Sequence, residues 1–297
     1  MNSKQVTTNI RRELKDYIQR HHLKSLVIGV SGGIDSTVCC ALARPVCDEL
    51  DIPLIGRSLP TNSNTEEEQI RADKTGKIFC TDYKEVNIRQ LFRATDSFLA
   101  LEGKACTVKG ELIRRGNIKA RARMIYLYNL AFIHGGMVLS TDNLTEYYLG
   151  FFTLHGDHND YGPIQNLWKT EVYELAQYLV EELEEAGNTE AAEIMRESIE
   201  AIPTDGLGIT DSDLDQIGAK DYAEVDIILK TWLCFSKKEF EDPTGTYTFP
   251  GRPEVYGDFA VYPRKVANHP VVKRYERTHF KRLWPISIDR KKIFQEQ

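Results

Sequence analysis

The sequence predicts an α/β fold with a doubly wound, mostly parallel sheet and helices on both faces. Short apolar stretches rich in β-branched residues alternate along the chain with longer stretches of helical period, and this alternation is typical of parallel sheets. Of the 297 residues, 41% are hydrophobic and 28% are charged, the balance of a globular protein with an ample core. We expect a single domain over residues 1–297, with an irregular excursion at about 237–265.

Four strands are predicted. "SLVIGV" (25–30) is short, continuous and rich in β-branched residues, as expected for a buried strand. "IPLIGRSL" (52–59) is a second buried strand, and "KIFCTDY" (77–83) and "GMVLST" (136–141) are the third and the fourth.

The predicted helices fill the intervals between these strands. An amphipathic helix near the N-terminus has Ile10, Leu14, Tyr17 and Ile18 at helical spacing. A second begins near Ser36 and should bend or stop around Pro45, because proline has no N–H. The polar segment after the second strand is a loop that enters a helix. Two further helices are predicted at about 110–134 and 169–187.

Composition limits the partners that we expect. The net charge of −6 and the pI near 5.7 give no electrostatic reason to bind nucleic acid. No apolar run approaches the roughly 20 residues that span a bilayer, and the N-terminus has no apolar signal core. The six cysteines show no C-x-x-C spacing, and Cys39, Cys40 and Cys47 are expected to be buried, reduced thiols. A cytoplasmic protein that binds neither nucleic acid nor a membrane is therefore expected.

The string "SGGIDS" (31–36) joins the first predicted strand to its helix. Glycines let the backbone approach a phosphate closely, and a helix N-terminus presents unpaired N–H groups. A glycine pair at such a turn is also consistent with a simple tight turn. The string lacks the lysine of the G-x-x-x-x-G-K-[ST] loop. Asp35 stands nearby, and carboxylates suit Mg²⁺.

Other polar strings have two interpretations each. "RGNIKARARMI" (115–125) is either a substrate site or a solvated basic helix face. In "LSTDNLTEYYLGFF" (139–152), the acidic residues are either ligands or helix caps. "HGDHND" (155–160) is best explained by polar turn residues rather than by a transition-metal site.

The string S-G-G-x-D-S resembles the pyrophosphate loop of the N-type ATP pyrophosphatases. Taken together, the motifs resemble one family, ammonia-dependent NAD synthetase, in family order and over most of the chain. These motifs are "SGGIDST" (31–37), "GNIKARARM" (116–124), "TDNLTE" (141–146), "GFFTLHGDHND" (150–160), "PTDGL" (203–207) and "KRLWP" (281–285).

The resemblance implies a Rossmann-like fold of the adenine nucleotide alpha hydrolase type. It also implies a ligase that forms a C–N bond. The carboxylate of deamido-NAD (nicotinic acid adenine dinucleotide) attacks the α-phosphorus of ATP, and ammonia then displaces AMP to give NAD. ATP is a co-substrate and Mg²⁺ the cofactor. A homodimer is implied as well, because the family builds its dinucleotide site across the subunit interface. No amidase nucleophile motif is present, so free ammonia, or ammonia from a separate protein, is the expected nitrogen source.

The resemblance also assigns roles to residues. Catalytic roles fall to Asp35, Lys169 and Glu146, and Mg²⁺ ligation to Asp35 and Glu146. The residues implied to bind ATP are Gly29, Val30, Ser31, Gly32, Gly33, Ile34, Asp35, Ser36, Thr141, Lys169 and Thr204. The residues implied to bind deamido-NAD are Arg121, Asp160 and Lys281. Lys169 stands out locally, because a lysine in the first turn of a helix is unfavourable and a ligand phosphate would explain it.

Three departures from the family pattern lie on the dinucleotide side. Leu154 stands where the family often has lysine, Phe280 replaces the histidine of a His-Lys pair, and "HGDHND" is one residue short. Two alternatives therefore stay open: an ATP pyrophosphatase with another acceptor, and a nucleotide-binding regulator that has lost catalysis.

Overall fold

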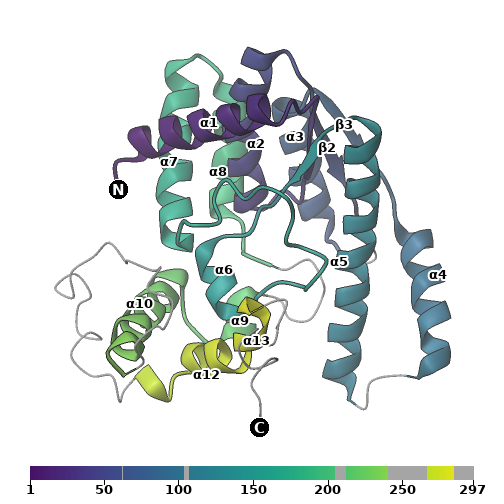
Figure 1. Ribbon diagram of the computed structural model, residues 1–297, viewed down its shortest axis with the longest axis vertical. Helices are drawn as coiled ribbons and strands as arrows, with labels where there is room; N and C mark the ends of the chain where they lie inside the picture. Colours follow the sequence, from purple (N-terminus) through teal and green to yellow (C-terminus); the bar gives the residue numbers. More distant parts are fainter. Residues whose placement is uncertain (62, 104–106, 205–211, 240–265, 284–297) are drawn as a thin grey trace, which may run out of the picture. The chain divides into compact units, whose positions relative to one another are not determined.

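The computed structural model describes residues 1–61, 63–103, 107–204, 212–239 and 266–283 (Figure 1). The chain divides into two compact units. The first comprises residues 1–144 and 152–216, and the second comprises 145–151 and the described residues after 216. Most of the predicted excursion at 237–265 lies outside the described residues, and the expectation of a single domain stays a prediction.

Within the described residues, the first unit contains a four-stranded parallel sheet in the order β3-β2-β1-β4. Its strands are β1 (Leu26–Gly29), β2 (Leu54–Ser58), β3 (Asp82–Glu85) and β4 (Met137–Leu139). β1 is central, with Leu26 opposite both Leu54 and Met137. The chain proceeds outward from β1 to β3 and then returns to the other side of β1 as β4. This reversal confirms the predicted doubly wound sheet and creates a topological switch point between β1 and β4.

The central strands alternate their side chains between two apolar cores. Leu26 and Ile28 belong to one core and Val27 to the other, as the two-residue period of a strand requires. The first core is closed by α1 (Ser3–Arg20), α2 (Ile34–Leu50), α3 (Glu66–Phe79), α7 (Lys169–Glu185) and α8 (Thr189–Glu200). The second is closed by α5 (Val108–Ile133). Helices therefore cover both faces of the sheet, as predicted (Figure 1).

Helix α2 continues through Pro45 to Leu50, so a stop at the proline, one of the two predicted outcomes, is wrong. Because proline has no N–H, the carbonyl of Ala41 one turn earlier has no helical donor. Arg11 of α1 donates from Nη2 to this carbonyl at 3.4 Å, and its guanidinium also binds both carboxylate oxygens of Glu182 in α7. A side chain from a neighbouring helix thus replaces the lost hydrogen bond, and α2 ends only at Leu50.

The third predicted strand, 77–83, is wrong up to residue 81. Residues 66–79 form α3, which begins with a capping box between Thr65 and Glu68. The buried positions of α3 follow the helical period: Ala72, Thr75, Gly76 and Phe79. The strand itself, β3, begins only at Asp82 and is an edge strand of polar, partly exposed residues.

The other predicted elements are confirmed with small shifts in their bounds. The N-terminal amphipathic helix is α1, the helix expected near Ser36 begins at Ile34, and the helices predicted at 110–134 and 169–187 are α5 and α7. The first unit also contains α4 (Arg89–Leu99) and the 3₁₀ turn η1 (Ala100–Glu102), and α9 (Asp213–Ile217) lies at its end. In the described part of the chain, no helix combines the length and apolarity needed to cross a bilayer.

The described cysteines are free thiols. Cys39, Cys40 and Cys47 are buried, which confirms the prediction for these three, and Cys80 is buried as well. Burial raises the pKa of Cys47 to about 12, so its reactive thiolate form is disfavoured.

The second unit is helical in its described part. It contains α6 (Leu144–Leu149) apart from its first residue, α10 (Tyr222–Glu239), α12 (Pro270–Arg277) and α13 (His279–Arg282). Thr278 fixes the end of α6, because its hydroxyl donates to the carbonyl of Leu149 at 3.0 Å. Gly150 has a φ of +57°, and a Cβ there would lie 2.4 Å from that of Thr278.

Candidate functional site

The loop between β1 and α2 is a glycine turn that leads into a helix N-terminus. Gly32 has a φ of +76°, and a Cβ at this position would lie 2.5 Å from the backbone nitrogen of Ala72 in α3. Gly33 is the N-cap of α2, and no side chain caps the helix there. The amides of the first turn of α2 are therefore available to an anion at the carboxyl end of β1.

Two serines hold this loop in its shape. Ser36 accepts a hydrogen bond from the amide of Ser31 at 3.3 Å and donates to the carbonyl of Gly33 at 3.0 Å. The hydroxyl oxygens of the two serines are 3.0 Å apart. Because these bonds close the turn on itself, the geometry of the loop is set without a ligand.

Asp35, in the first turn of α2, has a partner on each carboxylate oxygen. Asn143 donates from Nδ2 to Oδ1 at 3.0 Å, and the ammonium of Lys169 pairs with Oδ2. Asn143 follows β4, and Lys169 opens α7. The structure thus brings the predicted residues Asp35 and Lys169 into direct contact at the switch point. This pairing offsets the unfavourable position of Lys169 in a first helical turn.

Three other residues with predicted roles, Thr141, Thr204 and Arg121, belong to the first unit and lie on different elements. Thr141 is partly buried just after β4, and Thr204 donates its hydroxyl to Glu68 of α3. Arg121 is exposed on α5, where its Nε donates to the carbonyl of Leu154 at 3.3 Å.

Asp160 is bonded to the protein itself through both carboxylate oxygens. It accepts from the hydroxyl of Tyr128 and from the amide of Val138, each at 2.9 Å. These bonds fasten the segment after Thr153 to β4, so Asp160 has a structural role. Its predicted contact with a substrate stays a prediction.

Glu146 and Lys281 belong to the second unit. Glu146 lies in α6, where its carbonyl accepts from the amide of Phe151 at 2.9 Å. Lys281, in α13, donates from Nζ to the carbonyl of Gly150 at 2.8 Å. Their predicted roles with metal and substrate stay predictions.

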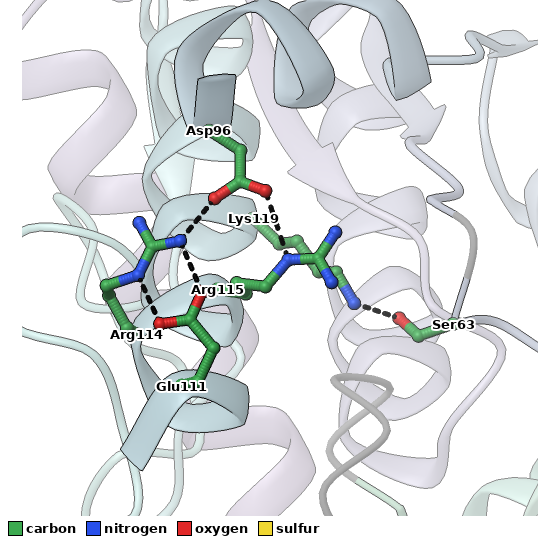
Figure 2. A network of polar contacts seen from close by, with 6 residues as sticks. All are labelled: Ser63, Asp96, Glu111, Arg114, Arg115 and Lys119. Carbon is green, nitrogen blue, oxygen red and sulfur yellow. Dashed lines mark hydrogen bonds and ion pairs between the residues drawn. The ribbon is translucent and has the colours of Figure 1, made fainter. Parts of the chain in front are cut away.

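Several basic side chains of α5 are bonded to other parts of the protein (Figure 2). Arg114 bridges Glu111 and Asp96 of α4, each at 2.6 Å, and Arg115 reaches the other oxygen of Asp96 at 3.1 Å. One turn on, Lys119 is buried and donates to the hydroxyl of Ser63 at 2.8 Å. Much of the positive charge of this motif therefore fixes α4 and a loop against α5.

Sequence reasoning assigned no role to a polar group just after β4. Asp142 is buried at the end of β4 and accepts from Ser140 at 3.1 Å. Its other contact is His158, whose Nδ1 lies 2.5 Å from the same carboxylate oxygen. Asp157 lies next to this pair, and burial and the charge of Asp142 raise its pKa. The string "HGDHND" marks the histidine, but its pairing across sixteen residues is not visible in the spacing.

Across the described ranges, no group of three or more His, Cys, Asp or Glu side chains is arranged to hold a metal ion. Mg²⁺, however, is commonly bound through one or two carboxylates together with substrate phosphates and water. Asp35 fits that pattern, because its carboxylate stands in the first turn of α2, next to the uncapped N-terminus of the helix.

A doubly wound parallel sheet with a glycine turn and an uncapped helix N-terminus at its switch point defines a nucleotide-binding α/β protein. The sequence profile described as NAD synthase matches residues 6–285. The chain belongs to the NAD synthase family.

Individual relatives agree with this membership. The NH(3)-dependent NAD(+) synthetase of Thermoplasma acidophilum is 36% identical over 74% of this chain and 80% of that protein. A structure of NMN synthetase from Francisella tularensis has a TM-score of 0.71 at 25% identity, over 97% of this chain and 99% of the other. An NH3-dependent NAD synthetase from Campylobacter jejuni, in complex with the nitrate ion, has a TM-score of 0.64 over 97% and 100%; at 20% identity it shows the fold alone.

Proposed function

We propose that this chain is an ammonia-dependent NAD synthetase, a ligase that converts deamido-NAD to NAD at the expense of ATP. The observation that carries the proposal is the Asp35 constellation. The glycine turn that follows β1 leads to Asp35, whose carboxylate is bonded by Asn143 and Lys169. The chain that contains this turn matches the NAD synthase family over residues 6–285.

The reaction has two steps, and neither needs a covalent bond to the protein. The carboxylate of deamido-NAD attacks the α-phosphorus of ATP, the bond to pyrophosphate breaks, and an acyl-adenylate forms. Ammonia then attacks the acyl carbon, and AMP leaves. Catalysis here consists of placing the reactants and stabilising the charge that develops on the leaving groups.

The residues of the first unit supply groups suited to the first step. The amides at the start of α2 would bind pyrophosphate oxygens, and Gly32 and Gly33 let the phosphate approach the backbone. Lys169, which is 2% exposed, would add a positive charge next to these amides. Thr141 and Thr204 are the further ATP contacts that we propose.

Asp35 is the residue of the first unit that would hold Mg²⁺, and we propose Glu146 as a second ligand. When bound to ATP, the ion would neutralise charge on the phosphates and stabilise the departing pyrophosphate. Among the described residues, Asp35 is bonded by Asn143 through one oxygen and by Lys169 through the other, and each carboxylate oxygen has a second lone pair that a cation would use.

A second acceptor, nicotinic acid mononucleotide, is favoured by two observations. One of the structures that align over nearly the full length of both chains, with a TM-score of 0.71 at 25% identity, is an NMN synthetase. In addition, Leu154 and Phe280 replace residues that the dinucleotide-using family often has. On this alternative the ATP chemistry is the same, and only the group that carries the nicotinic carboxylate is smaller. Arg121, Asp160 and Lys281 would bind that group in either case.

We also propose a cytoplasmic homodimer. The helices α4 and α5 carry large apolar side chains that are exposed in the single chain, including Phe98, Val108 and Phe132. Phe132 is 89% exposed. A second copy that covered these side chains would remove them from water.

One assay tests the function and its acceptor. The purified chain is given ATP, Mg²⁺ and ammonium with no acceptor, with deamido-NAD or with nicotinic acid mononucleotide, and pyrophosphate and amide products are measured. Pyrophosphate and NAD formed with deamido-NAD support the first proposal, and a higher kcat/KM with the mononucleotide supports the second. Binding of ATP without turnover on either acceptor would contradict both and favour a regulator.

A further inference from the structure

Three buried hydroxyl groups meet next to the first turn of α2, where α2, α3 and α8 pack against one another. They belong to Thr37 of α2, Thr75 of α3 and Ser198 of α8, and each of these residues is at most 1% exposed. The hydroxyl oxygen of Thr37 lies 3.0 Å from that of Ser198 and 3.4 Å from that of Thr75. Because bulk water does not reach these hydroxyls, the protein itself must supply their hydrogen-bond partners.

Thr37 connects this hydroxyl cluster to the N-cap of α2. Its hydroxyl lies 3.0 Å from the carbonyl of Gly33, which also accepts from the amide of Thr37 at 3.1 Å and from the hydroxyl of Ser36 at 3.0 Å. The planar peptide group that carries this carbonyl carries the N–H of Ile34 at its other end. Hydrogen bonds that hold the carbonyl therefore also hold this N–H, which is the first amide of α2 and has no acceptor within the helix.

The hydrogen atoms of the three hydroxyls can be shared in two ways. When Thr37 donates to Gly33, the two lone pairs of its oxygen accept from Thr75 and from Ser198. When Thr37 instead donates to Ser198, the hydrogen of Ser198 goes to the carbonyl of Ile194 at 3.1 Å. An anion bound to the N–H of the same peptide group favours the first arrangement, because it polarises that group and makes the Gly33 carbonyl a stronger acceptor.

We infer that Ser198 and Thr75 are positioning residues for the pyrophosphate part of ATP, an inference that rests on the proposed function. Both donate to Thr37, Thr37 donates to Gly33, and the N–H of Ile34 is thereby held toward the pyrophosphate oxygens. Ser198 and Thr75 are too buried to touch the ligand, and neither belongs to a motif that resembles the family. Pyrophosphate is the leaving group of the first step, so the amide that meets it must stand in place before the charge develops.

The test measures binding of pyrophosphate and of AMP, each with Mg²⁺, to the full chain by calorimetry. Ser198→Ala removes one donor to Thr37. The matched control is Ser25→Ala, which removes an equally buried serine hydroxyl that donates to the carbonyl of His134 at 3.3 Å. Ser25 precedes β1 and lies at the opposite end of this strand from the glycine turn. AMP lacks the two phosphates that the turn is proposed to bind, so it reports on the rest of the ATP site.

We expect Ser198→Ala to weaken pyrophosphate binding about fivefold, the effect of one net hydrogen bond, and to leave AMP binding unchanged. Ser25→Ala should change neither affinity, although both variants should unfold at a lower urea concentration. Thr37→Val removes the hydroxyl through which Ser198 acts. In that background, Ser198→Ala should therefore have no further effect on pyrophosphate binding.

Unchanged pyrophosphate binding by Ser198→Ala would overturn the inference, and so would a wild-type chain that bound no pyrophosphate. Equal weakening of pyrophosphate and AMP binding would show a general structural role, and an additive effect in the Thr37→Val background would show that Ser198 does not act through Thr37. Should Ser198→Ala not fold, Thr75→Val takes its place, with Thr7→Val at a buried position of α1 as its control. Failure of the proposed function is seen separately, as a wild-type chain that releases no pyrophosphate from ATP with either acceptor.

Discussion

Lys169 and Asp35 form an ion pair that joins the first turn of α7 to the first turn of α2. Lys169 is almost fully buried, and the Asp35 side chain is 18% exposed. The buried ammonium of Lys169 thus neutralises the charge of the Asp35 carboxylate, and the carboxylate itself stays accessible to solvent and to a ligand. One residue pair therefore serves the stability of the fold and the proposed site together.

The first prediction is that Asp35→Asn reduces kcat by about 100-fold or more, because the charge proposed to hold Mg²⁺ on the ATP phosphates is lost. The same change removes the carboxylate from a buried ammonium and should lower the free energy of unfolding by about 2 kcal/mol. Steady-state kinetics and urea unfolding measure the two effects.

The double variant Asp35→Asn, Lys169→Met separates these effects. Since it removes the ammonium as well, we expect it to regain most of the lost stability and to remain inactive. Near-normal turnover of the single variant would remove Asp35 from the metal site.

The second prediction concerns Gly32. Alanine there must adopt a φ of +76° and place its Cβ 2.5 Å from a backbone nitrogen of α3, so Gly32→Ala should cost about 3 kcal/mol and weaken ATP binding. Gly135→Ala is the matched control. It also has a positive φ, +61°, but its nearest neighbours lie 3.5 Å away, so it should cost about 1 kcal/mol and leave ATP binding unchanged. Equal ATP affinity of the two variants, measured by calorimetry, would contradict a role for this turn.

Which strands could be predicted follows from where they lie in the sheet. β1 is buried on both faces or nearly so and is a continuous apolar run. β2 is also buried, although it contains Arg57, which pairs with Asp82 of β3. β3 is at the edge, where its polar residues are tolerated, and the apolar residues ahead of it belong to the end of α3. The continuation of α2 through Pro45 depends on Arg11, thirty residues from Ala41. No local pattern contains that contact.

Some residues of the candidate site could be predicted from the sequence and others could not. The turn at Ser31–Ser36 could be predicted, because the proposed function needs a contiguous string of small residues and one carboxylate. Asn143 and His158 could not, because their contacts depend on partners 108 and 16 residues away. Only the closure of the sheet at β4 brings those partners together.

The third prediction tests how α2 tolerates its proline. Arg11→Met removes the donor to Ala41 and the pair with Glu182, and should lower the free energy of unfolding by about 2 kcal/mol. Pro45→Ala restores an amide for Ala41, so in that background Arg11→Met should cost about 1 kcal/mol less. A double-mutant cycle by urea unfolding measures this coupling. Strict additivity would mean that Arg11 acts through Glu182 alone.

The fourth prediction is that Phe132→Asp dissociates the proposed homodimer. Phe132 is 89% exposed near the end of α5, so a charge there has little cost in the free chain. In an interface it would have to be buried without a partner, at a cost of about 3 kcal/mol or more, which weakens association by at least 100-fold. Light scattering after size exclusion should give a dimer for wild type and a monomer for the variant. Ile70→Asp, a partly exposed apolar position on α3, is the control and should stay dimeric. A wild-type monomer at all concentrations tested, or a Phe132→Asp dimer of unchanged affinity, would place the interface elsewhere or remove it.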